Sequence, residues 1–269
     1  MNKKYSVKNE ENYRKSENNK NKKTEKTLLS ISNISINSGI ADCIILENKK
    51  IIYKIPLKKN IIEFGCGVFP LSFGILNQNI SKNYLATDVS KDIINSAKKN
   101  DSRPSYKIID LNNIKKYNFK IKYDLIILKG VLHHLRNPKK TLGILKKIMK
   151  KNSYIVISEP NSVSFVANIL KLLLSLFNVN LEDSPYGQLS QKKINHMIKI
   201  NKFIIEDQWY SSLFAFIASG DYGRIKIFPN KRFIFKIIII IDKIVDTILN
   251  LILISKFTHF KVNYLIKSK

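Results

Sequence analysis

The sequence is poor in cysteine, and it has no early hydrophobic run. Cys43 and Cys66 are the only two cysteines in 269 residues, which excludes a disulfide framework, and neither lies in a cluster with metal-ligand spacing. This composition fits a reducing compartment, and we expect a cytoplasmic protein without a bound metal. Residues 1–26 are almost wholly polar and lack the apolar region of a signal peptide, which argues against secretion by that route.

Acidic residues and arginine are also scarce. With 47 basic and 20 acidic residues the net charge is +27, which suggests nucleic acid or an anionic membrane as a partner. Only five of the basic residues are arginine, the residue preferred for bidentate recognition of phosphates and base edges. Lysine, asparagine and isoleucine are all abundant, which indicates a coding bias. We therefore disfavour nucleic acid and regard attraction to a membrane surface as the more credible use of the charge.

Composition changes along the chain. Residues 1–26 are rich in Lys, Asn and Glu without apolar periodicity, which predicts a disordered basic tail. Residues 27–59 hold short apolar pieces typical of a leading helix. From residue 60 onward, strand-length apolar runs alternate with helix-length amphipathic stretches. We expect one domain over residues 27–269.

The alternation of strands and helices predicts a parallel sheet covered on both faces, with right-handed crossovers. Strands are expected at 60–64, 84–87, 106–109, 124–128, 154–158, 203–209 and 262–266. Helices are expected at 70–78, 90–99, 137–151, 163–177 and 190–199. No internal repeat is present.

A glycine turn follows the first expected strand. Gly65 and Gly67 can adopt backbone angles closed to other residues and can expose N–H groups to a ligand. Three acidic residues, Glu63, Asp88 and Asp110, lie at or near the carboxyl ends of successive strands, where parallel sheets bind ligands. Asp88, about 20 residues past the turn, can accept from both hydroxyls of a ribose. Asp110 is placed to accept from the exocyclic amine of an adenine. Helix capping is the alternative role for each carboxylate.

Two common nucleotide sites do not fit this turn. A dinucleotide fingerprint needs a third glycine at position 70, where Pro70 stands, and this disfavours NAD and FAD. No Lys-Ser/Thr pair follows the turn to form a triphosphate-binding loop. The turn therefore predicts a nucleoside ligand of another kind.

Five ordered motifs resemble the class I S-adenosylmethionine-dependent methyltransferases, in particular their small-molecule, type 11-like branch. The family's first motif matches 63–67, its ribose acid matches Asp88, and its acidic residue near adenine matches Asp110. Residues 123–135, with the segments 137–138 and 158–161, are similar to later motifs of that branch. The resemblance covers 60–161 strongly and 189–211 weakly. It implies an α/β fold, a Rossmann-like three-layer sandwich with a mostly parallel seven-stranded sheet and helical insertions in the C-terminal half.

The resemblance also implies S-adenosylmethionine as cofactor and a small molecule as methyl acceptor. Residues of the matching motifs are expected to bind the cofactor: Glu63, Gly65, Cys66, Gly67, Asp88, Val89, Asp110, Leu111, Lys129 and Gly130. Either His133 or His134, at the edge of the cleft, is expected to act as general base. We favour His134, which matches the more regularly occupied histidine of the motif. A packing or capping role is the alternative for both.

Two segments depart from the family pattern. Phe69 replaces the third glycine of the first motif, so we expect either a wider turn or a ring packed beside the methionine part of the cofactor. Lys151-Asn152-Ser153 replaces the usual Pro-Gly-Gly turn before the fifth strand. Asn152 tolerates a left-handed conformation, so a turn at this position is still expected.

The C-terminal half contains two long apolar segments, 162–188 and 212–258, outside the expected cofactor-binding core of 60–161. Four charged residues interrupt the run 233–255, which argues against a membrane span of ~20 uncharged residues. One interpretation is a helical insertion packed on the core or on a partner subunit. The other is a lid or interfacial helix that admits an apolar substrate from a bilayer.

We therefore expect an enzyme that transfers a methyl group to an oxygen of a small acceptor. An apolar, lipid-like or glycan-pathway acceptor fits the apolar segments, and a protein with this composition is expected in the cytoplasm or on the inner face of the membrane. The alternatives are an RNA methyltransferase that uses the Lys-rich tail, and a non-catalytic, membrane-associated module that retains the fold.

Overall fold

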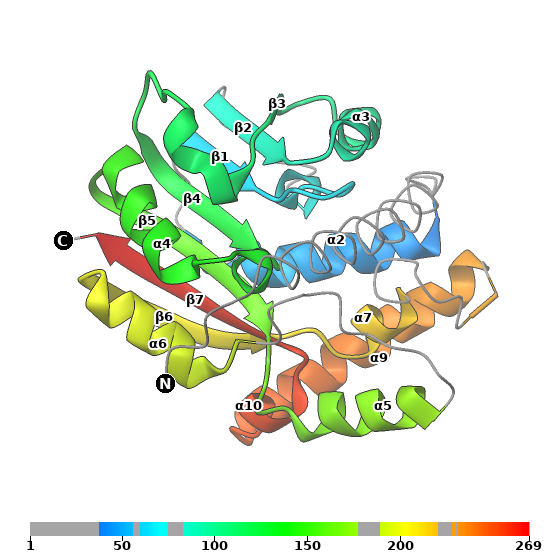
Figure 1. Ribbon diagram of the computed structural model, residues 1–269. Coiled ribbons are helices and arrows are strands. Elements are labelled where there is room, and N and C mark those ends of the chain that lie inside the picture. The colour runs from blue at the N-terminus through cyan, green and yellow to red at the C-terminus, as the bar shows by residue number, and fades with distance from the viewer. Residues whose placement is uncertain are drawn as a thin grey trace.

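The computed structural model describes residues 38–55, 60–74, 83–176, 189–219, 228–229 and 231–268. The strands in these ranges form one seven-stranded sheet in the order β3-β2-β1-β4-β5-β7-β6, with β7 antiparallel to both of its neighbours (Figure 1). The strands are β1 (Asn60–Phe64), β2 (Asn83–Asp88), β3 (Ser105–Ile108), β4 (Tyr123–Lys129), β5 (Met149–Pro160), β6 (Phe203–Ser211) and β7 (Lys261–Ser268). This arrangement confirms the fold expected from the sequence.

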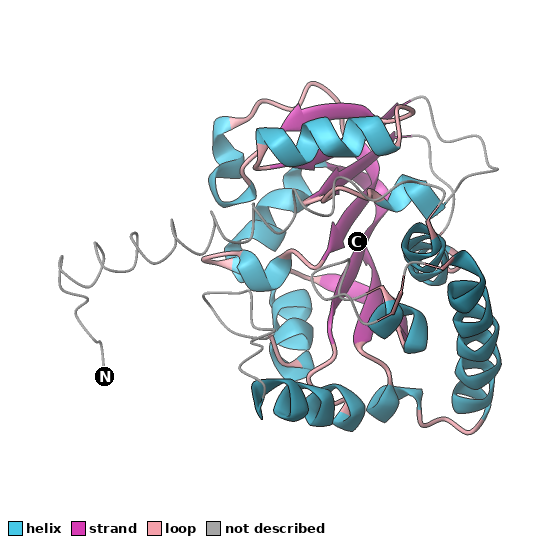
Figure 2. Cartoon of the chain, turned by 90° about the vertical axis from the view of Figure 1, so that its right-hand side faces the viewer, coloured by secondary structure: helices cyan, strands magenta, loops and turns pink. Residues whose placement is uncertain are grey.

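The helices cover both faces of the sheet (Figure 2). The α-helices are α2 (Gly39–Ile52), α3 (Lys91–Asn100), α4 (Pro138–Leu145), α5 (Phe165–Leu176), α6 (Gln191–Ile200), α7 (Phe214–Ala218), α9 (Arg232–Leu251) and α10 (Ser255–Thr258). The 3-10 helices are η1 (Leu71–Gly74), η2 (Leu111–Lys116), η3 (Leu132–His134) and η4 (Lys146–Ile148).

Alternation along the central strands explains why the sheet is buried on two sides. Ile126 and Leu128 of β4 pack with α4, α6 and η2, whereas Leu125 and Ile127 pack with α2, α3 and η1. Successive side chains of a strand point to opposite faces, so a continuous apolar run forms two cores at once. Because β1, β2, β4 and β5 run parallel, their carboxyl ends meet at one edge of the sheet.

Most expected elements are present, with one clear error at the start of β5. The predicted helix over 137–151 is wrong at its end, because helical structure stops at Ile148 and Met149 already pairs with Tyr123 of β4. Asn152 has a φ of 58°, so the expected left-handed turn is confirmed, but it lies within the strand rather than before it. The basic tail 1–26, residues 75–78 of the expected helix and the segment 177–188 lie outside the described residues.

Phe69 lies in the hydrophobic layer between α2 and α3. Its side chain is 3% exposed, and its ring centroid is 5.2 Å from that of Phe73. Ala41, Ile44 and Ile93 belong to the same cluster. The ring that replaces the family's glycine therefore contributes to packing of the helices next to the turn.

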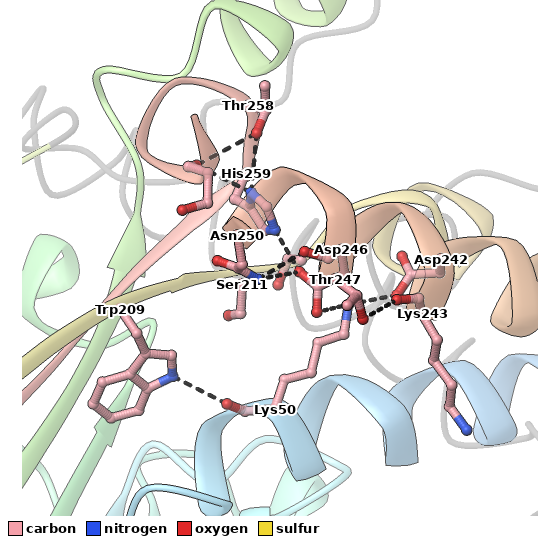
Figure 3. Close-up of polar contacts among 12 residues, drawn as sticks. Lys50, Trp209, Ser211, Asp242, Lys243, Asp246, Thr247, Asn250, Thr258 and His259 are labelled. Atoms are coloured by element: carbon pink, nitrogen blue, oxygen red, sulfur yellow. Dashed lines mark hydrogen bonds and ion pairs between the residues drawn. The ribbon is translucent and has the colours of Figure 1, made fainter. Parts of the chain in front are cut away.

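A buried cluster of charged residues attaches α9 to α2. Lys50 of α2 forms an ion pair with the fully buried Asp242 of α9 and lies 3.6 Å from Asp246 (Figure 3). The second oxygen of Asp242 accepts from the N–H of Ala215 at 2.9 Å. Burial by itself would raise the pKa of Asp246, but a hydrogen bond with His259 and the Lys50 charge hold that pKa below its usual range. The two carboxylates of α9 therefore face the protein interior.

Replacing Lys50 by methionine is expected to lower the free energy of unfolding by about 3 kcal/mol, because Asp242 then stays buried without its cation. Adding Asp242→Asn should recover part of this loss, since the uncompensated charge is removed while an oxygen remains for Ala215. Urea unfolding of the three proteins measures both effects. Equal stability of Lys50→Met and the parent would contradict this role for the cluster.

Candidate active site

The glycine turn after β1 adopts the left-handed backbone that only glycine takes at low cost. Gly65 and Gly67 have φ values of 65° and 60°. A Cβ on Gly65 would lie 2.5 Å from Cγ2 of Val131, whereas a Cβ on Gly67 would meet nothing within 4 Å. Between them, Cys66 donates its N–H to the carbonyl of Thr87 at 2.9 Å. The turn is thus held against β2 and β4 and is open at Gly67.

Two of the expected cofactor residues are fully enclosed by protein. Glu63 accepts from the N–H of Leu71 at 3.0 Å and from the hydroxyl of Tyr84 at 2.7 Å. Burial raises the pKa of Glu63, and the nearby Lys129 charge opposes this rise. Burial also raises the pKa of the Cys66 thiol well above its ordinary value, so this thiol is a poor nucleophile. Glu63 fastens the segment after the turn to β1 and β2.

Asp88 lies where β2 ends, beside the turn. Its carboxylate accepts from the N–H of Gly67 at 3.2 Å and from the N–H of Ser90 at 3.1 Å. Burial raises the pKa of Asp88, while these two hydrogen bonds act in the opposite direction. A carboxylate has about four lone-pair sites, so Asp88 can still accept from hydroxyl groups of a ligand.

Three further residues expected to bind the cofactor, Val89, Asp110 and Leu111, are placed differently from one another. Val89 is 65% exposed next to Asp88. Asp110 caps η2, because its carboxylate accepts from the N–H of Asn112 at 2.8 Å and from the amide of Asn113. Leu111 is buried in the core. The capping role considered for Asp110 is therefore real, whether or not the carboxylate also meets a ligand.

Lys129 is the last residue of β4, and Gly130 follows it. The ammonium of Lys129 donates to Oδ1 of Asn48 at 3.1 Å and to the carbonyl of Phe69 at 3.0 Å. Gly130 has a φ of 66°, and its N–H donates to the carbonyl of Ser158 at 2.7 Å. Lys129 thus connects β4 to α2 and to the turn after β1, while Gly130 lets the chain leave the sheet abruptly.

The two histidines follow immediately in η3. Nδ1 of His133 lies 2.5 Å from Oε2 of Glu159, and Oε1 of Glu159 accepts from the N–H groups of Val131 and Leu132 at 3.0 and 2.8 Å. His133 is buried and His134 is half-buried, with ring centroids 4.1 Å apart. The carboxylate of Glu159, at the end of β5, therefore fixes both the loop and the imidazole.

Sequence reasoning assigned no role to two residues of this site. Glu159 lies in one of the recognised motifs, and its position at a strand end was the available signal. Asn48 is buried in α2, where its amide donates to the carbonyl of Pro70 and accepts from Lys129. The sequence gives no sign of this, because a buried asparagine and an exposed one look the same in the sequence of an amphipathic helix. Both Glu159 and Asn48 connect elements that are far apart in the sequence.

The carboxyl edge of the sheet offers a nucleoside open space, an acidic acceptor and an apolar side chain. Open space beside Gly67, the buried carboxylate of Asp88 and the exposed Val89 lie together at the ends of β1 and β2. These residues fit S-adenosylmethionine, whose ribose and adenine need an acidic acceptor and an apolar contact.

A family model described as a methyltransferase domain matches residues 57–202, more than half of the chain. With the sheet order above, this shows that the chain belongs to the class I S-adenosylmethionine-dependent methyltransferases, enzymes that use S-adenosylmethionine as cofactor. Similar solved structures agree on the fold. Magnesium protoporphyrin IX methyltransferase from Synechocystis, with bound S-adenosylhomocysteine, has a TM-score of 0.57 at 15% identity and covers 93% of this chain and 96% of its own. A SAM-dependent methyltransferase from Archaeoglobus fulgidus has a TM-score of 0.55 at 16% identity, covering 83% and 93%.

Two curated relatives match shorter stretches. Malonyl-[acyl-carrier protein] O-methyltransferase 2 of Ilyobacter polytropus is 33% identical over 100 residues, which are 37% of this chain and 38% of that protein. The hybrid PKS-NRPS synthetase iliA of Neonectria is 28% identical over 139 residues, 49% of this chain and 3% of that protein. The chain thus covers well under two thirds of either relative.

Gly65→Ala is expected to destabilise the protein by more than Gly67→Ala. Both substitutions carry the left-handed strain of about 1–2 kcal/mol, but only the first adds a collision with Val131. Combining Gly65→Ala with Val131→Ala should remove the collision and lower the added cost, apart from the price of the lost methyl groups. Denaturant unfolding of the four proteins provides the comparison. Equal losses for the two single variants would show that the collision is relieved by movement of the turn.

Proposed function

We propose that this enzyme methylates an oxygen of a small acceptor, with His133 as general base. The observation that carries the proposal is the contact between His133, in the loop after β4, and Glu159, near the end of β5. Cε1 of the same imidazole lies 3.9 Å from the position that a Cβ on Gly130 would take, so the ring borders the loop expected to hold the methionine part of the cofactor. A base oriented by a buried carboxylate is the arrangement that proton removal from a hydroxyl needs.

In this proposal the chain supplies alignment and proton transfer. S-adenosylmethionine, when bound, supplies an electrophilic methyl group on a sulfonium. Glu159 accepts from Nδ1 of His133, and in this proposal the other ring nitrogen, Nε2, serves the acceptor. When the methyl group is transferred, Nε2 would take the hydroxyl proton of the acceptor oxygen. Glu159 then stabilises the imidazolium that forms, and no covalent enzyme intermediate is required.

The sequence alone favoured His134, and the contact with Glu159 changes our choice to His133. His134 stacks against His133 and is the more exposed of the two rings. We assign it to the acceptor side of the cleft. For the cofactor, we propose that Asp88 accepts from the ribose, that Val89 packs on the adenine, and that Gly65, Gly67 and Gly130 let the backbone approach the ligand.

The proposed acceptor is apolar or lipid-like. Support comes from the exposed apolar side chains of α5 and α9, and from the similarity to a protein named as an O-methyltransferase. A glycan-pathway acceptor fits the same cleft less well, because these helices present few polar groups. With this substrate class we propose that the enzyme is cytoplasmic and works at the inner face of a membrane.

His133→Ala is expected to lower kcat by about 10²–10⁴-fold while leaving the affinity for S-adenosylmethionine within a few-fold of the parent, because the base acts only in the chemical step. Glu159→Gln should show a smaller loss of kcat together with lower stability. His134→Ala removes the neighbouring ring but leaves the contact with Glu159, and should lower kcat by less than His133→Ala does. A larger loss in His134→Ala than in His133→Ala would return the role of base to His134.

The acceptor class can be found with isotopically labelled S-adenosylmethionine and a fractionated cell extract. We expect the enzyme to transfer label to the lipid or apolar small-molecule fraction, and calorimetry to show micromolar binding of the cofactor. Label that enters RNA would instead support an RNA methyltransferase. Absence of any cofactor binding by the folded protein would reject methyl transfer altogether.

A further inference from the structure

Helix α9 presents its apolar side chains to the outside. Residues at three- and four-residue spacing form one stripe along its outer face: Phe233, Ile237, Ile240, Ile244, Ile248 and Leu251. Each is at least 49% exposed. A surface helix of a globular protein normally turns such a stripe toward the core and its charges toward water. In α9 this stripe faces outward instead, and the inner face carries Asp242 as well as the apolar Phe235.

The reason for the reversal is visible in the contacts on the inner face. Asp242 and Asp246, the only carboxylates of α9, point toward Lys50 and His259 (Figure 3). Inward packing of α9 therefore depends on these ion pairs as well as on Phe235, which packs with α2 and α7. Because the ion pairs fix the rotation of the helix, the isoleucine stripe has to face outward.

The exposed apolar surface continues beyond α9. Leu251 at the end of α9 and Leu253 in the turn after it are 76% and 83% exposed. Leu253 has a left-handed conformation with φ 59°. The helix α10 packs against both α5 and α9 (Figure 1). The side chains of Ile169, Leu172 and Leu176 on α5 are exposed. The two long helices and the turn thus form a single surface, which we call the apolar rim.

The charges at the apolar rim are of one sign. Lys236, Lys243 and Lys256 are exposed beside the stripe, and no carboxylate of α5, α9 or α10 is exposed there. A second copy of the chain would bring lysines against lysines. An anionic lipid surface accepts both the apolar side chains and the lysines, and a net charge of +27 adds long-range attraction to it.

We propose that the apolar rim docks onto the surface of an anionic bilayer, with the isoleucine stripe of α9 immersed at the level of the lipid headgroups. No described helix combines the length and the apolar character needed to cross a membrane, so the proposed contact is peripheral. Helix α5 starts only a few residues after β5 ends, and α10 leads directly into β7. The docked face therefore lies at the same edge of the sheet as the candidate active site, where an apolar acceptor would enter.

The test is sedimentation of the full chain with vesicles of phosphatidylcholine mixed with phosphatidylglycerol, and with vesicles of phosphatidylcholine alone. We expect binding to the mixed vesicles that weakens as salt is added. The double variant Ile240→Glu, Ile244→Glu should bind at least about tenfold more weakly, because two apolar anchors become anionic. Lys236→Gln and Lys243→Gln should each weaken binding to the mixed vesicles by about fivefold.

Ile121→Glu with Ile204→Glu is the matched control, since both isoleucines are exposed but lie outside the apolar rim. This control should bind vesicles as the parent does. All variants keep the N-terminal lysines, and unchanged S-adenosylmethionine binding and melting temperature show that they are folded. Unchanged vesicle binding in the α9 double variant would overturn the proposal. So would a parent protein that ignores vesicles and forms a dimer which the same variant dissociates, because the occupant would then be a second copy.

Discussion

The structure depends on how the chain leaves a parallel sheet at its carboxyl edge. A strand buried on both faces must end in a turn that frees the backbone without burying unpaired polar groups. Gly65, Gly67 and Gly130 meet this constraint with left-handed angles, and their N–H groups or neighbours bond to the next strand. At Gly67 the turn also leaves open space, because nothing lies within 4 Å of the position that a Cβ would take. The glycines that meet this structural need are therefore also the residues at which we propose that the cofactor approaches the backbone.

Buried carboxylates fasten these turns to one another. Glu63 connects β1 with η1 and β2, Asp88 connects β2 with the glycine turn, and Glu159 connects β5 with the loop after β4. Each carboxylate accepts backbone N–H groups that have no partner within a helix or strand and would otherwise be buried without a hydrogen bond. Glu159 differs from the other two because it also holds an imidazole, and this single extra contact converts a structural fastener into part of a candidate catalytic pair.

A third buried ionic group controls the surface rather than the cleft. Lys50, Asp242 and Asp246 attach α9 to α2, and we expect this cluster to fix the orientation of the helix. Rotation of α9 by half a turn would bury the isoleucines and expose the aspartates. The cluster prevents this, so a hydrophobic surface is maintained in a chain that otherwise carries a large positive charge.

The sequence by itself determined the positions of the strands along the chain, the glycine turn and the acidic residues at the strand ends, because alternation, glycine spacing and motif order are local properties, whereas the order of the strands in the sheet comes from the tertiary structure. It was wrong about the end of the helix before β5, where pairing of Met149 with β4 overrides helical periodicity. Only the tertiary structure decided which histidine meets Glu159, that Asn48 reaches Lys129, and which face of α9 is outward. Each of these three contacts joins residues from separate elements of the fold. The free energy of burying a charged or polar group depends on its partner, and the sequence around one residue does not show which partner it meets.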